Sequence, residues 1–502
     1  MRLTEKFKIT PFAKILPLFA LGILLAGFIP APVDIVLATT AAIWIAAWKL
    51  KDSAAGPWYT AAAIVLTGVS ITLLNLRKDN VPKSKRVYIA TEITSTPYTS
   101  GRWQRTTANI GYYKIGDSDW LRTNEKIELY IDTSYTVVLG EQIAVSTYLN
   151  PIDTIGSRYG ALMRSRGMNS RAYIVPNSIV ARMDAPKRSP GYYSGLMQEW
   201  MTARIDRLRM DSQHKSMVKA LVAGSRTTLD RDLRAAYSRT GTAHILAVSG
   251  LHMGFVFIII NLVFGWTTLL RRGHLVKNVA VIVAIWLYAM CAGLSPSVVR
   301  AALMLSAAQV ALFNSVRGSS YNIILACATL MLAVNPFYLF DVSFQLSFAA
   351  VLSIIFFYPR LYRRKLNRNR LVDTVWSSLL LGFAAQIGVL PIVAYNFGNI
   401  PIVSVLINPA VIFTAFIIIL LGLVWVLLPF GFLNLIVSKI LGIAVILQNG
   451  VVLWGDSLPV SSVNNVNMPG WGVALFYLIL GTVALIIKIN EERSETSPKL
   501  SI

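Results

Sequence analysis

Long apolar runs alternate with polar stretches along this chain and predict most of its architecture. Three runs come first, at 11–29, 33–50 and 57–76, and each approaches the roughly 20 residues that a helix needs to cross a bilayer. After a polar region, apolar residues return at Thr242 and continue almost to the end of the chain. We predict nine further spans there: 244–270, 275–292, 298–314, 320–334, 341–358, 374–395, 402–428, 435–453 and 470–488.

The polar region between the third and fourth spans has the alternation of β-strands. Strand-like runs, separated by turn residues such as Gly101 and Gly140, occur at 87–95, 103–113, 126–133, 142–149 and 170–180. With a helix expected near 155–166, five short strands favour a small barrel of the OB type. The next segment, 191–241, is amphipathic and helical, and we expect it on the membrane surface or under the barrel.

Lysine and arginine are distributed unequally between the loops. If the N-terminus is cytoplasmic, the short outer loops contain neither residue type: 30–33, 293–297, 335–340, 396–401 and 454–469. The inner loops contain Lys49, Lys51, Arg271, Arg272, Lys277, Arg317 and the basic cluster from Arg360 to Arg370. This asymmetry fits twelve spans with both termini in the cytoplasm and 77–190 outside it. The short 320–334 run and the stretch between Pro401 and Pro409 are alternatively re-entrant.

The predicted fold is therefore a polytopic α-helical membrane protein of about 12 spans with an extracytoplasmic, OB-like β-barrel insert. No small-residue cleavage site follows the basic N-terminus, which favours an uncleaved first span over a signal peptide. The expected domains are 1–76 (three transmembrane helices), 77–190 (barrel), 191–241 (amphipathic helical linker), 242–488 (polytopic channel domain) and 489–502 (polar cytoplasmic tail).

Composition agrees with the apolar pattern. The 502 residues are 55% hydrophobic and only 14% charged, which excludes an ordinary soluble globule. The net charge of +23 exceeds what loop orientation requires, and the remainder can attract a polyanion. Cys291 and Cys327 lie in apolar runs, and we interpret them as small hydrophobic residues without a disulfide or a metal.

One segment has chemistry that a simple lipid-facing helix does not need. It runs from Asp232 to Gly254 and reads Asp-Leu-Arg-Ala-Ala-Tyr-Ser-Arg-Thr-Gly-Thr-Ala-His-Ile-Leu-Ala-Val-Ser-Gly-Leu-His-Met-Gly. It resembles the signature of the ComEC family of competence proteins, the inner-membrane channels for incoming DNA. Further segments are similar to that family in the same order: Gly293-Leu-Ser-Pro-Ser-Val-Val-Arg-Ala, Asn335-Pro, Phe340-Asp-Val-Ser-Phe-Gln-Leu-Ser-Phe, Ala384-Ala-Gln-Ile-Gly-Val-Leu-Pro and Asn408-Pro. The resemblance covers about 220–425.

The resemblance implies a channel for single-stranded DNA in natural transformation, with no enzymatic activity and no cofactor. Many members carry a C-terminal metallo-β-lactamase-like domain, and we expect a short form without it, because only the polar tail follows the last span. The implied partners are single-stranded DNA, membrane lipids, a DNA receptor, a separate nuclease and a cytoplasmic translocase; a homodimer is left open. No Gly-x-x-x-x-Gly-Lys-[Ser/Thr] motif occurs, so we expect the driving force to come from a partner or a proton gradient.

Polar residues within the predicted spans are the candidates for a channel or gate. Arg300 is costly in lipid and either lines a pore or pairs with Asp341. Asp341 and Gln345 share one helical face, which indicates either a lumen or hydrogen bonds between helices. Gln386 is interpreted in the same way. The channel or gate candidates are His244, Ser249, Gly250, His252, Gly254, Arg300, Asp341, Gln345 and Gln386.

Within the signature, we expect Ser249 and Gly250 to bend a helix, so that its backbone amides meet an anion or solvent. Plain helix packing is the alternative. A metal site is not favoured, because four histidines without a His-Glu-x-x-His pair make a poor ligand set. Two other functions stay open: transport of a smaller anion, and a membrane-embedded hydrolase that uses Ser249 with His244 or His252.

The predicted barrel interleaves basic and aromatic residues. Residues 77–190 contain 17 basic and 10 acidic side chains. Cations bind phosphates and rings stack on bases, so this composition favours single-stranded nucleic acid, whereas a solvated face with aromatic residues in the core is the alternative. The candidate DNA-binding residues are Lys85, Arg86, Arg102, Trp103, Arg105, Tyr112, Tyr113 and Lys114.

Overall fold

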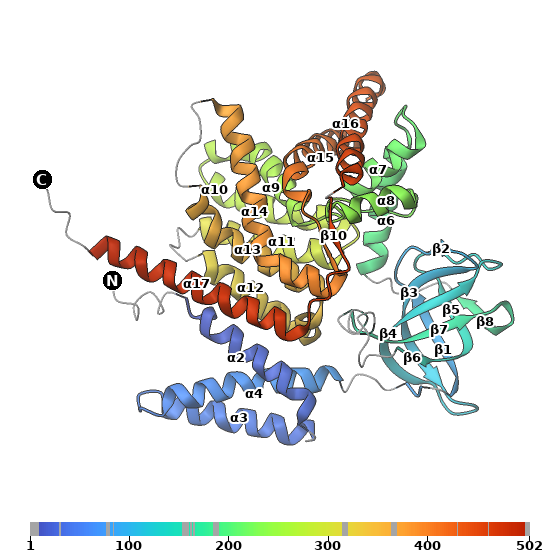
Figure 1. Ribbon diagram of the computed structural model, residues 1–502. Coiled ribbons are helices and arrows are strands. Elements are labelled where there is room, and N and C mark those ends of the chain that lie inside the picture. The colour runs from blue at the N-terminus through green and yellow to red at the C-terminus, as the bar shows by residue number, and fades with distance from the viewer. Residues whose placement is uncertain are drawn as a thin grey trace, which may run out of the picture.

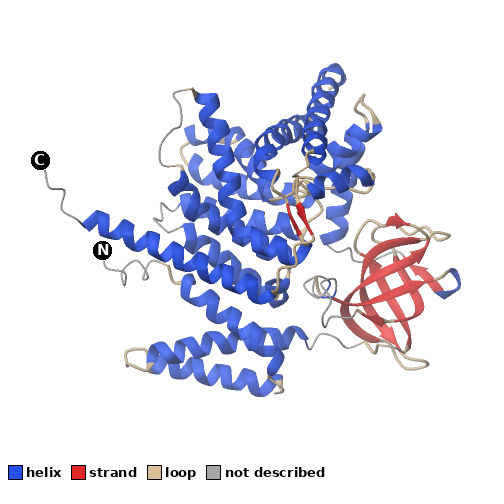
Figure 2. Ribbon diagram, viewed as in Figure 1, coloured by secondary structure: helices blue, strands red, loops and turns tan. Residues whose placement is uncertain are grey.

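The computed structural model describes most of the chain: residues 10–29, 32–76, 81–83, 85–152, 160, 163, 166–183, 190–313, 320–362, 369–428, 430–459 and 461–496. Helices form the body of the molecule, and most strands form one barrel beside it (Figure 2). Most of the helix expected near 155–166 lies outside the described residues, and so do Arg317 and most of the basic cluster that follows Arg360.

Three N-terminal helices coincide with the first three apolar runs: α2 (Phe12–Leu25, continued by the 3-10 turn η1, Ala26–Phe28), α3 (Val33–Lys49) and α4 (Gly56–Leu76). Glycines let α2 and α4 touch, since a Cβ atom on Gly22 would lie 2.0 Å from the carbonyl oxygen of Val65. The α2 helix also packs against α12 (Ser320–Val334), where Phe19 and Leu332 share a core. These helices therefore form a layer at the edge of the body.

Eight strands form the barrel: β1 (Arg86–Ile93), β2 (Tyr98–Ser100), β3 (Trp103–Lys114), β4 (Leu121–Asp132), β5 (Gln142–Tyr148), β6 (Asn150–Pro151), β7 (Met168–Ile174) and β8 (Ile179–Met183), with the short turn η2 (Pro176–Ser178). Their order is β6-β7-β4-β3-β1-β5-β8, and β2 pairs with β3. All pairs are antiparallel except β4 with β7. Four of the five predicted strands correspond to β1, β3, β4 and β5. The fifth, predicted over 170–180, is interrupted by η2 and divided between β7 and β8.

The period-two pattern of these strands places one face of each in a common interior. On β1, Val87 and Ile89 are fully buried, and Leu129 of β4 meets them in the same core. The Thr147 hydroxyl of β5 donates to the carbonyl oxygen of Tyr173 on β7 at 3.2 Å. Because this contact joins two strands far apart in the pairing order, the sheet curls round on itself.

The segment after the barrel forms α6 (Pro190–Asp206), α7 (Ser212–Ala223) and α8 (Arg231–Arg239). At its start α6 meets the barrel, because a Cβ atom on Gly195 would lie 2.0 Å from the Leu139 side chain. The next helix, α7, is buried along most of its length, and Met217 and Leu221 belong to the main helical core. Of the two positions expected for 191–241, the membrane surface is therefore wrong for α7, whereas the start of α6 lies against the barrel.

The remaining elements are α9 (Gly250–Val263), η3 (Gly265–Leu269), α10 (Gly273–Cys291), α11 (Pro296–Phe313), α12, η4 (Pro336–Phe340), α13 (Val342–Leu361), α14 (Arg370–Phe397), β9 (Asn399–Ile400), α15 (Ser404–Leu427), α16 (Gly431–Ser457), β10 (Val463–Asn464) and α17 (Gly470–Thr496). In the described part, eight helices are long and apolar enough to cross a membrane: α4, α10, α11, α13, α14, α15, α16 and α17. Three other apolar helices, α2, α9 and α12, are shorter. The chain is thus a polytopic helical membrane protein.

The helical body has one main core and a broad apolar exterior. Residues of α6–α11, α15 and α16 form the core, in which Val411 and Ile418 of α15 are fully buried. The α17 helix lies on the outside, and its hydrophobic side chains, such as Leu478, are exposed as lipid-facing residues are. The first turn of α2 and the last turn of α17 lie on the side away from the barrel (Figure 1).

Candidate functional site

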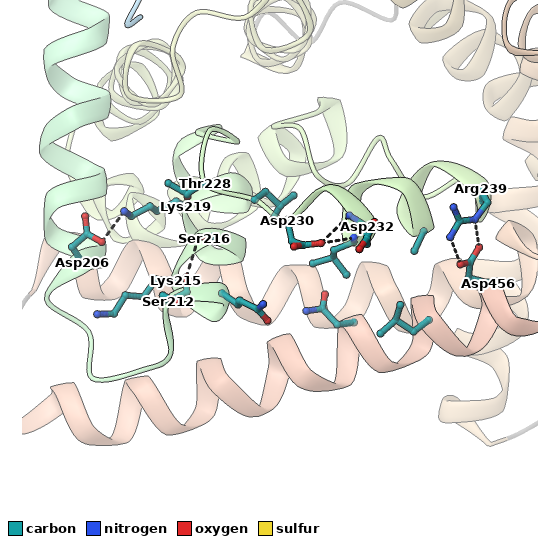
Figure 3. A pocket seen from close by; sticks show the side chains of 16 residues that line it. Asp206, Ser212, Lys215, Ser216, Lys219, Thr228, Asp230, Asp232, Arg239 and Asp456 are labelled. Atoms are coloured by element: carbon teal, nitrogen blue, oxygen red, sulfur yellow. Dashed lines mark hydrogen bonds and ion pairs between the residues drawn. The ribbon is translucent and has the colours of Figure 1, made fainter. Parts of the chain in front are cut away.

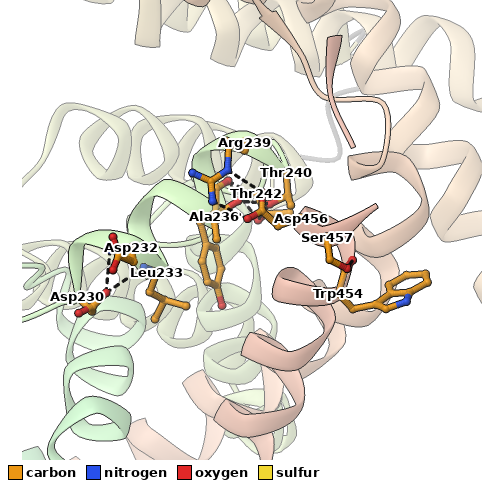
Figure 4. A network of polar contacts seen from close by, with 11 residues as sticks. Asp230, Asp232, Leu233, Ala236, Arg239, Thr240, Thr242, Trp454, Asp456 and Ser457 are labelled. Carbon is orange, nitrogen blue, oxygen red and sulfur yellow. Dashed lines mark hydrogen bonds and ion pairs between the residues drawn. The ribbon is translucent and has the colours of Figure 1, made fainter. Parts of the chain in front are cut away.

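The first half of the signature segment forms α8, which is tied to α16 by polar contacts (Figure 4). The Asp230 carboxylate caps α8 by accepting from the backbone N–H groups of Asp232 and Leu233. Arg239, at the end of the helix, binds Asp456 of α16 in a two-pronged ion pair, with an Nε–Oδ1 distance of 2.8 Å. Nothing in the sequence indicates this pair, because its members are far apart along the chain.

Tyr237 and two threonines complete this junction from the inside. The Tyr237 ring is fully buried, and its hydroxyl donates to Asn449 Oδ1 of α16 at 2.9 Å. Burial raises the pKa of this phenol, so it stays a neutral donor. The buried hydroxyls of Thr240 and Thr242 bond to each other at 2.9 Å. The α8–α16 junction therefore places a polar network inside an apolar core.

Between these threonines, Gly241 makes the turn that ends α8. Its φ of +74° is a left-handed conformation, and a Cβ atom there would lie 2.4 Å from the Pro401 ring. The carbonyl oxygen of Gly241 lies 3.1 Å from Nδ1 of His244, whose side chain is exposed. Gly241 of the signature therefore packs against Pro401, and the side chain of His244 stays accessible.

The second half of the signature forms the entrance to α9. Ser249 is the N-cap of that helix and His252 is its third residue, so the helix begins at Ser249–Gly250, where the sequence predicted a bend. The Ser249 hydroxyl lies 2.9 Å from Nδ1 of His252, and the Ser249 N–H points to the same nitrogen. Nδ1 is then the acceptor, and the proton is on Nε2. His252 is fully buried, and Nε2 has no partner in the part of the chain that the structure describes.

Arg300 of α11 lies beside this entrance. Its neighbour Ala301 approaches Gly250 of α9, where a Cβ atom would be 3.9 Å from the alanine methyl group. The Arg300 side chain is 2% exposed, and its terminal nitrogen donates to the carbonyl oxygen of Ser343 at 3.0 Å. Among the described residues, Nε and the other terminal nitrogen of Arg300 have no partner. A buried cation with two hydrogen-bond donors that have no partner is energetically costly and unusual in a membrane protein.

Asp341 and Gln345 have local partners at the start of α13. Asp341 is 1% exposed and caps the helix by accepting from the N–H of Ser343 at 2.7 Å. Gln345 donates to the carbonyl oxygen of Leu339 at 2.9 Å. Within the described chain, Asp341 forms no ion pair with Arg300 within 4.0 Å. It therefore acts as a helix cap near the arginine.

Gln386 and Gly254 lie elsewhere in the body. Gln386 of α14 donates to the hydroxyl of Ser404, the first residue of α15, which in turn donates to the carbonyl oxygen of Pro401. Pro401 also packs against Gly241, so Gln386 lies near the turn that ends α8. Gly254 packs loosely, because a Cβ atom there would meet nothing within 4 Å.

A cavity of about 910 Å³ lies between α7, α8 and α16 (Figure 3). The Arg239–Asp456 pair closes one end, and at the other Lys219 Nζ lies 2.7 Å from Asp206 Oδ1. Its lining includes four aspartates and three basic residues: Asp206, Asp230, Asp232, Asp456, Lys215, Lys219 and Arg239. None of the candidate channel residues lines it. The cavity is thus separate from the Ser249–Arg300 region.

On the barrel, the DNA-binding candidates fall into two groups at opposite ends of β3. The first contains Lys85, Arg86, Tyr112 and Lys114. Lys114 Nζ lies 5.0 Å from the centre of the Tyr88 ring and 5.6 Å from that of Trp120. Arg86 donates to the Ser146 hydroxyl, and Tyr112 is 48% exposed. This end presents cations and rings together.

The second group contains Arg102, Trp103 and Arg105. Trp103 meets Tyr173 edge to face at 5.5 Å, and Tyr173 stacks on Tyr130 at 5.0 Å. Arg105 is paired with Glu128, and Arg102 binds Asp132. Hydrogen bonds from Ser134, and then from Arg102, hold the pKa of Asp132 below its usual value. Arg105 and Lys114 are nine residues apart along the extended strand β3, which separates the two groups by roughly 30 Å.

Tyr113 differs from the other candidates because it is 7% exposed and belongs to the barrel core. Its ring is unavailable for stacking in this conformation. Tyr130 and Tyr173 lie on the surface instead, and the sequence analysis missed them. Alternation along β4 and β7 was the available signal, since both tyrosines flank fully buried aliphatic residues.

Hydrolytic and metal chemistry find limited support in this geometry. Ser249 and His252 are within hydrogen-bonding distance, but no described carboxylate contacts Nε2 of the histidine. Among the described residues, no group of three or more His, Cys, Asp or Glu side chains has the arrangement of a metal site.

Comparison with known proteins places the signature in context. The family described as Competence protein matches residues 221–489, more than half of the chain. ComE operon protein 3 of Bacillus subtilis (strain 168) is 31% identical over 194 residues, which are 38% of this chain and 24% of that protein. An uncharacterized protein of Aquifex aeolicus (strain VF5) is 29% identical over 213 residues, 42% of this chain and 47% of its own length. The matched region thus spans less than half of these relatives. No solved structure matches the chain.

Proposed function

The chain belongs to the competence protein family, and from this premise we propose that it conducts single-stranded DNA inward across the cytoplasmic membrane. The observation that carries the proposal is the buried Arg300, which offers two free donors beside the signature helix entrance. A guanidinium attracts phosphate, and a single strand needs a far narrower path than a duplex does. The chain itself is proposed to be non-catalytic.

We propose twelve spans with both termini in the cytoplasm and the barrel outside. The loop charges support this orientation, and the first turn of α2 and the last turn of α17 lie away from the barrel. The proposed domains are 1–76, 77–190, 191–241, 242–488 and 489–502. Of these, 191–241 shares its core with the channel domain, which supports treating the two as one folded body.

An OB-type barrel is part of the proposal. In that fold, strands one to three form an antiparallel meander, and the third strand pairs in parallel with the fifth. Here β1, β3 and β4 are the meander, β4 runs parallel to β7, and β5 pairs with β1. This order supports an OB-type module that binds DNA through its exposed cations and rings. Tyr113 is left out of the binding surface because it is buried.

For the path through the body, we propose that residues around the α9 entrance line a gated conduit. Two observations support this: Ser249 and His252 are within hydrogen-bonding distance at the entrance, and Ala301, the neighbour of Arg300, approaches Gly250. Arg300 and His252 are buried, so conduction requires the helices to separate and let water or phosphate reach the free donors. His244, Gly254, Gln345 and Gln386 are proposed secondary positions along the path.

The proposed partners are a DNA receptor, a separate nuclease and a cytoplasmic translocase, together with membrane lipids and a second copy of the chain in a homodimer. The test is complementation in a transformable bacterium that lacks its own family member. We expect cytoplasmic accumulation of fluorescent DNA to return when this chain is expressed. The proposal fails if the chain inserts in the membrane and the partners are correctly targeted, but labelled DNA still stays outside.

A hydrolase that uses Ser249 is the second candidate, because the serine hydroxyl lies 2.9 Å from a histidine nitrogen. A fluorophosphonate probe distinguishes the two functions. Labelling that disappears in Ser249→Ala would favour the hydrolase, whereas we expect no labelling of either protein.

A further inference from the structure

The cavity between α7, α8 and α16 has no role in the function proposed above. The Lys219–Asp206 and Arg239–Asp456 ion pairs mark its two ends (Figure 3). Exposed side chains line both ends, because the side chain of Asp206 is 53% accessible and that of Arg239 51%. The cavity therefore opens on the outside of the helical body and is not enclosed within its core.

The position of the cavity along α16 sets its depth in the membrane. Near the start of this helix, Asn434 Oδ1 accepts from the N–H of Arg209, just before α7, at 3.1 Å. Near its end, Asp456 binds Arg239, the last residue of α8. The segment of α16 between these contacts is roughly 33 Å long at 1.5 Å per residue, about the thickness of the hydrocarbon core of a bilayer. Because α16 is long and apolar enough to span a membrane, the cavity lies at the depth of the hydrocarbon.

Contact with lipid does not suit the lining of this cavity. On its outer side, α16 exposes aliphatic residues such as Ile443 and Leu447, as lipid-facing helices do. The adjoining cavity is lined instead by seven charged side chains and by polar ones such as Gln213 and Thr228, both exposed. Charged groups are costly in hydrocarbon unless they face a partner or water. Another polar surface or water therefore covers the cavity in the membrane.

The charges of the lining match a second copy of the chain better than they match DNA. Four aspartates outnumber three basic side chains, so the cavity does not attract a polyanion. Each end contains both signs: Asp206 with Lys215 and Lys219 at one end, and Arg239 with Asp456 at the other. In the described part of the chain, Lys215 has no carboxylate within 4.0 Å, so positive charge is left over at its end.

Symmetry makes this charge pattern self-complementary. Two copies inserted in a membrane with the same orientation are related by a two-fold axis along the membrane normal. Such an axis keeps every residue at its own depth, so each end of the cavity faces the identical end of the other copy. Because both ends carry both signs, acidic and basic side chains can pair between the copies at each depth.

We propose that two copies of the chain associate through this cavity, with α7, α8 and the adjoining side of α16 as the interface. The inference rests on the homodimer in the proposed function and names its surface. Association covers the exposed Gln213, Thr228 and Asp232, and it removes the charged lining from lipid. Leu453 of α16, which lines the cavity and is 50% exposed, adds an apolar contact.

The first test is cross-linking of the full-length protein in native membranes by a bismaleimide with a flexible spacer. Thr228→Cys places a thiol on the cavity lining, and we expect a dimer band with this variant. The parent protein, which retains Cys291 and Cys327, should give none. Leu478→Cys on α17, where the leucine is 69% exposed, is the matched control for random collisions and should stay monomeric.

The second test exchanges charges at the end of the cavity that holds Lys215. Lys215→Glu makes this end predominantly acidic, whereas Asp206→Lys makes it basic. Each variant alone should self-associate about tenfold or more weakly than the wild type in co-purification of two tagged copies, because like charges then face each other. Co-expression of the two variants should restore association, since their charges are complementary. Lys277→Glu, on α10 and away from the cavity lining, is the control and should associate as the wild type does.

Three results would overturn the proposal. They are a wild type that stays monomeric in membranes, a Thr228→Cys dimer band no stronger than that of Leu478→Cys, and failure of the two charge variants to associate with each other. In the first case, reaction of Thr228→Cys with a membrane-impermeant maleimide would assign the cavity to water. Association is measured without DNA, so each of these results leaves the proposed conduction of DNA standing.

Discussion

Removal of the buried charge at Arg300 tests whether this residue lines a conduit for DNA or only stabilises the fold. The perturbation is the double variant Arg300→Met, Asp341→Asn. Methionine fills a similar elongated volume without charge, and asparagine caps a helix about as well as aspartate, so the N–H of Ser343 keeps its acceptor. Replacing both residues avoids leaving Asp341, which is 1% exposed, without a nearby positive charge.

The structure lets the stability change be worked out. The lost hydrogen bond from Arg300 to Ser343 contributes about 1.5–3 kcal/mol, because its donor is charged. Against this, the two partnerless nitrogens cost about 1–3 kcal/mol each, which the variant regains. A loss of about 1.5–3 kcal/mol against a gain of about 2–6 kcal/mol places the double variant between about 1 kcal/mol less stable and about 4.5 kcal/mol more stable than the wild type. If Arg300 served mainly to stabilise the fold, its replacement would cause a much larger loss of stability.

The assay pairs two measurements on the same variant. Thermal unfolding in detergent should give a melting temperature close to that of the wild type or above it, while uptake of labelled DNA by cells should fall to the level of a strain without the protein. The single variant Arg300→Met should unfold more readily than the double variant, because it leaves the carboxylate unbalanced. Two results would contradict this prediction: DNA uptake at the wild-type level by a folded double variant, or a large loss of stability in that variant.

The remaining predictions concern the turn, the helix cap and the barrel. Gly241→Ala should destabilise the protein by at least about 1–2 kcal/mol in thermal unfolding, since its φ is left-handed and its Cβ would strike Pro401; an unchanged melting temperature would contradict this. Ser249→Ala should cost about 1 kcal/mol through loss of the cap, whereas Ser249→Asp should recover most of it. Tyr112→Ala should weaken binding of single-stranded DNA by about 1–3 kcal/mol in anisotropy titrations, while Tyr112→Phe, which keeps the ring, should bind normally.

Hydrophobic patterning predicted most elements of the fold but not their packing. Each of the twelve predicted apolar ranges contains a helix, and four of the five predicted strands form, whereas the fifth is divided between β7 and β8. The pattern failed for α7, whose burial depends on partners in α15 and α16 that are remote in sequence. The predicted strand also begins five residues after the start of β4, because the first residues of β4, from Leu121 onward, are mostly exposed and do not alternate between buried and exposed positions.

The candidate site was only partly accessible from the sequence. The signature marked Ser249 and His252, and their pairing at the start of α9 follows from local chain geometry. Long-range pairs such as Arg239 with Asp456 leave no trace in a single sequence. Such contacts arise only when separate elements are brought together.

The proposed function requires DNA to cross the bilayer through this chain. The most direct measurement reconstitutes the purified protein in vesicles, with the partners it requires, and follows protection of an external fluorescent oligonucleotide from added nuclease. We predict a protected fraction that grows with time in wild-type vesicles and is absent with the Arg300→Met, Asp341→Asn variant. Equal protection in wild-type, variant and protein-free vesicles would contradict the account.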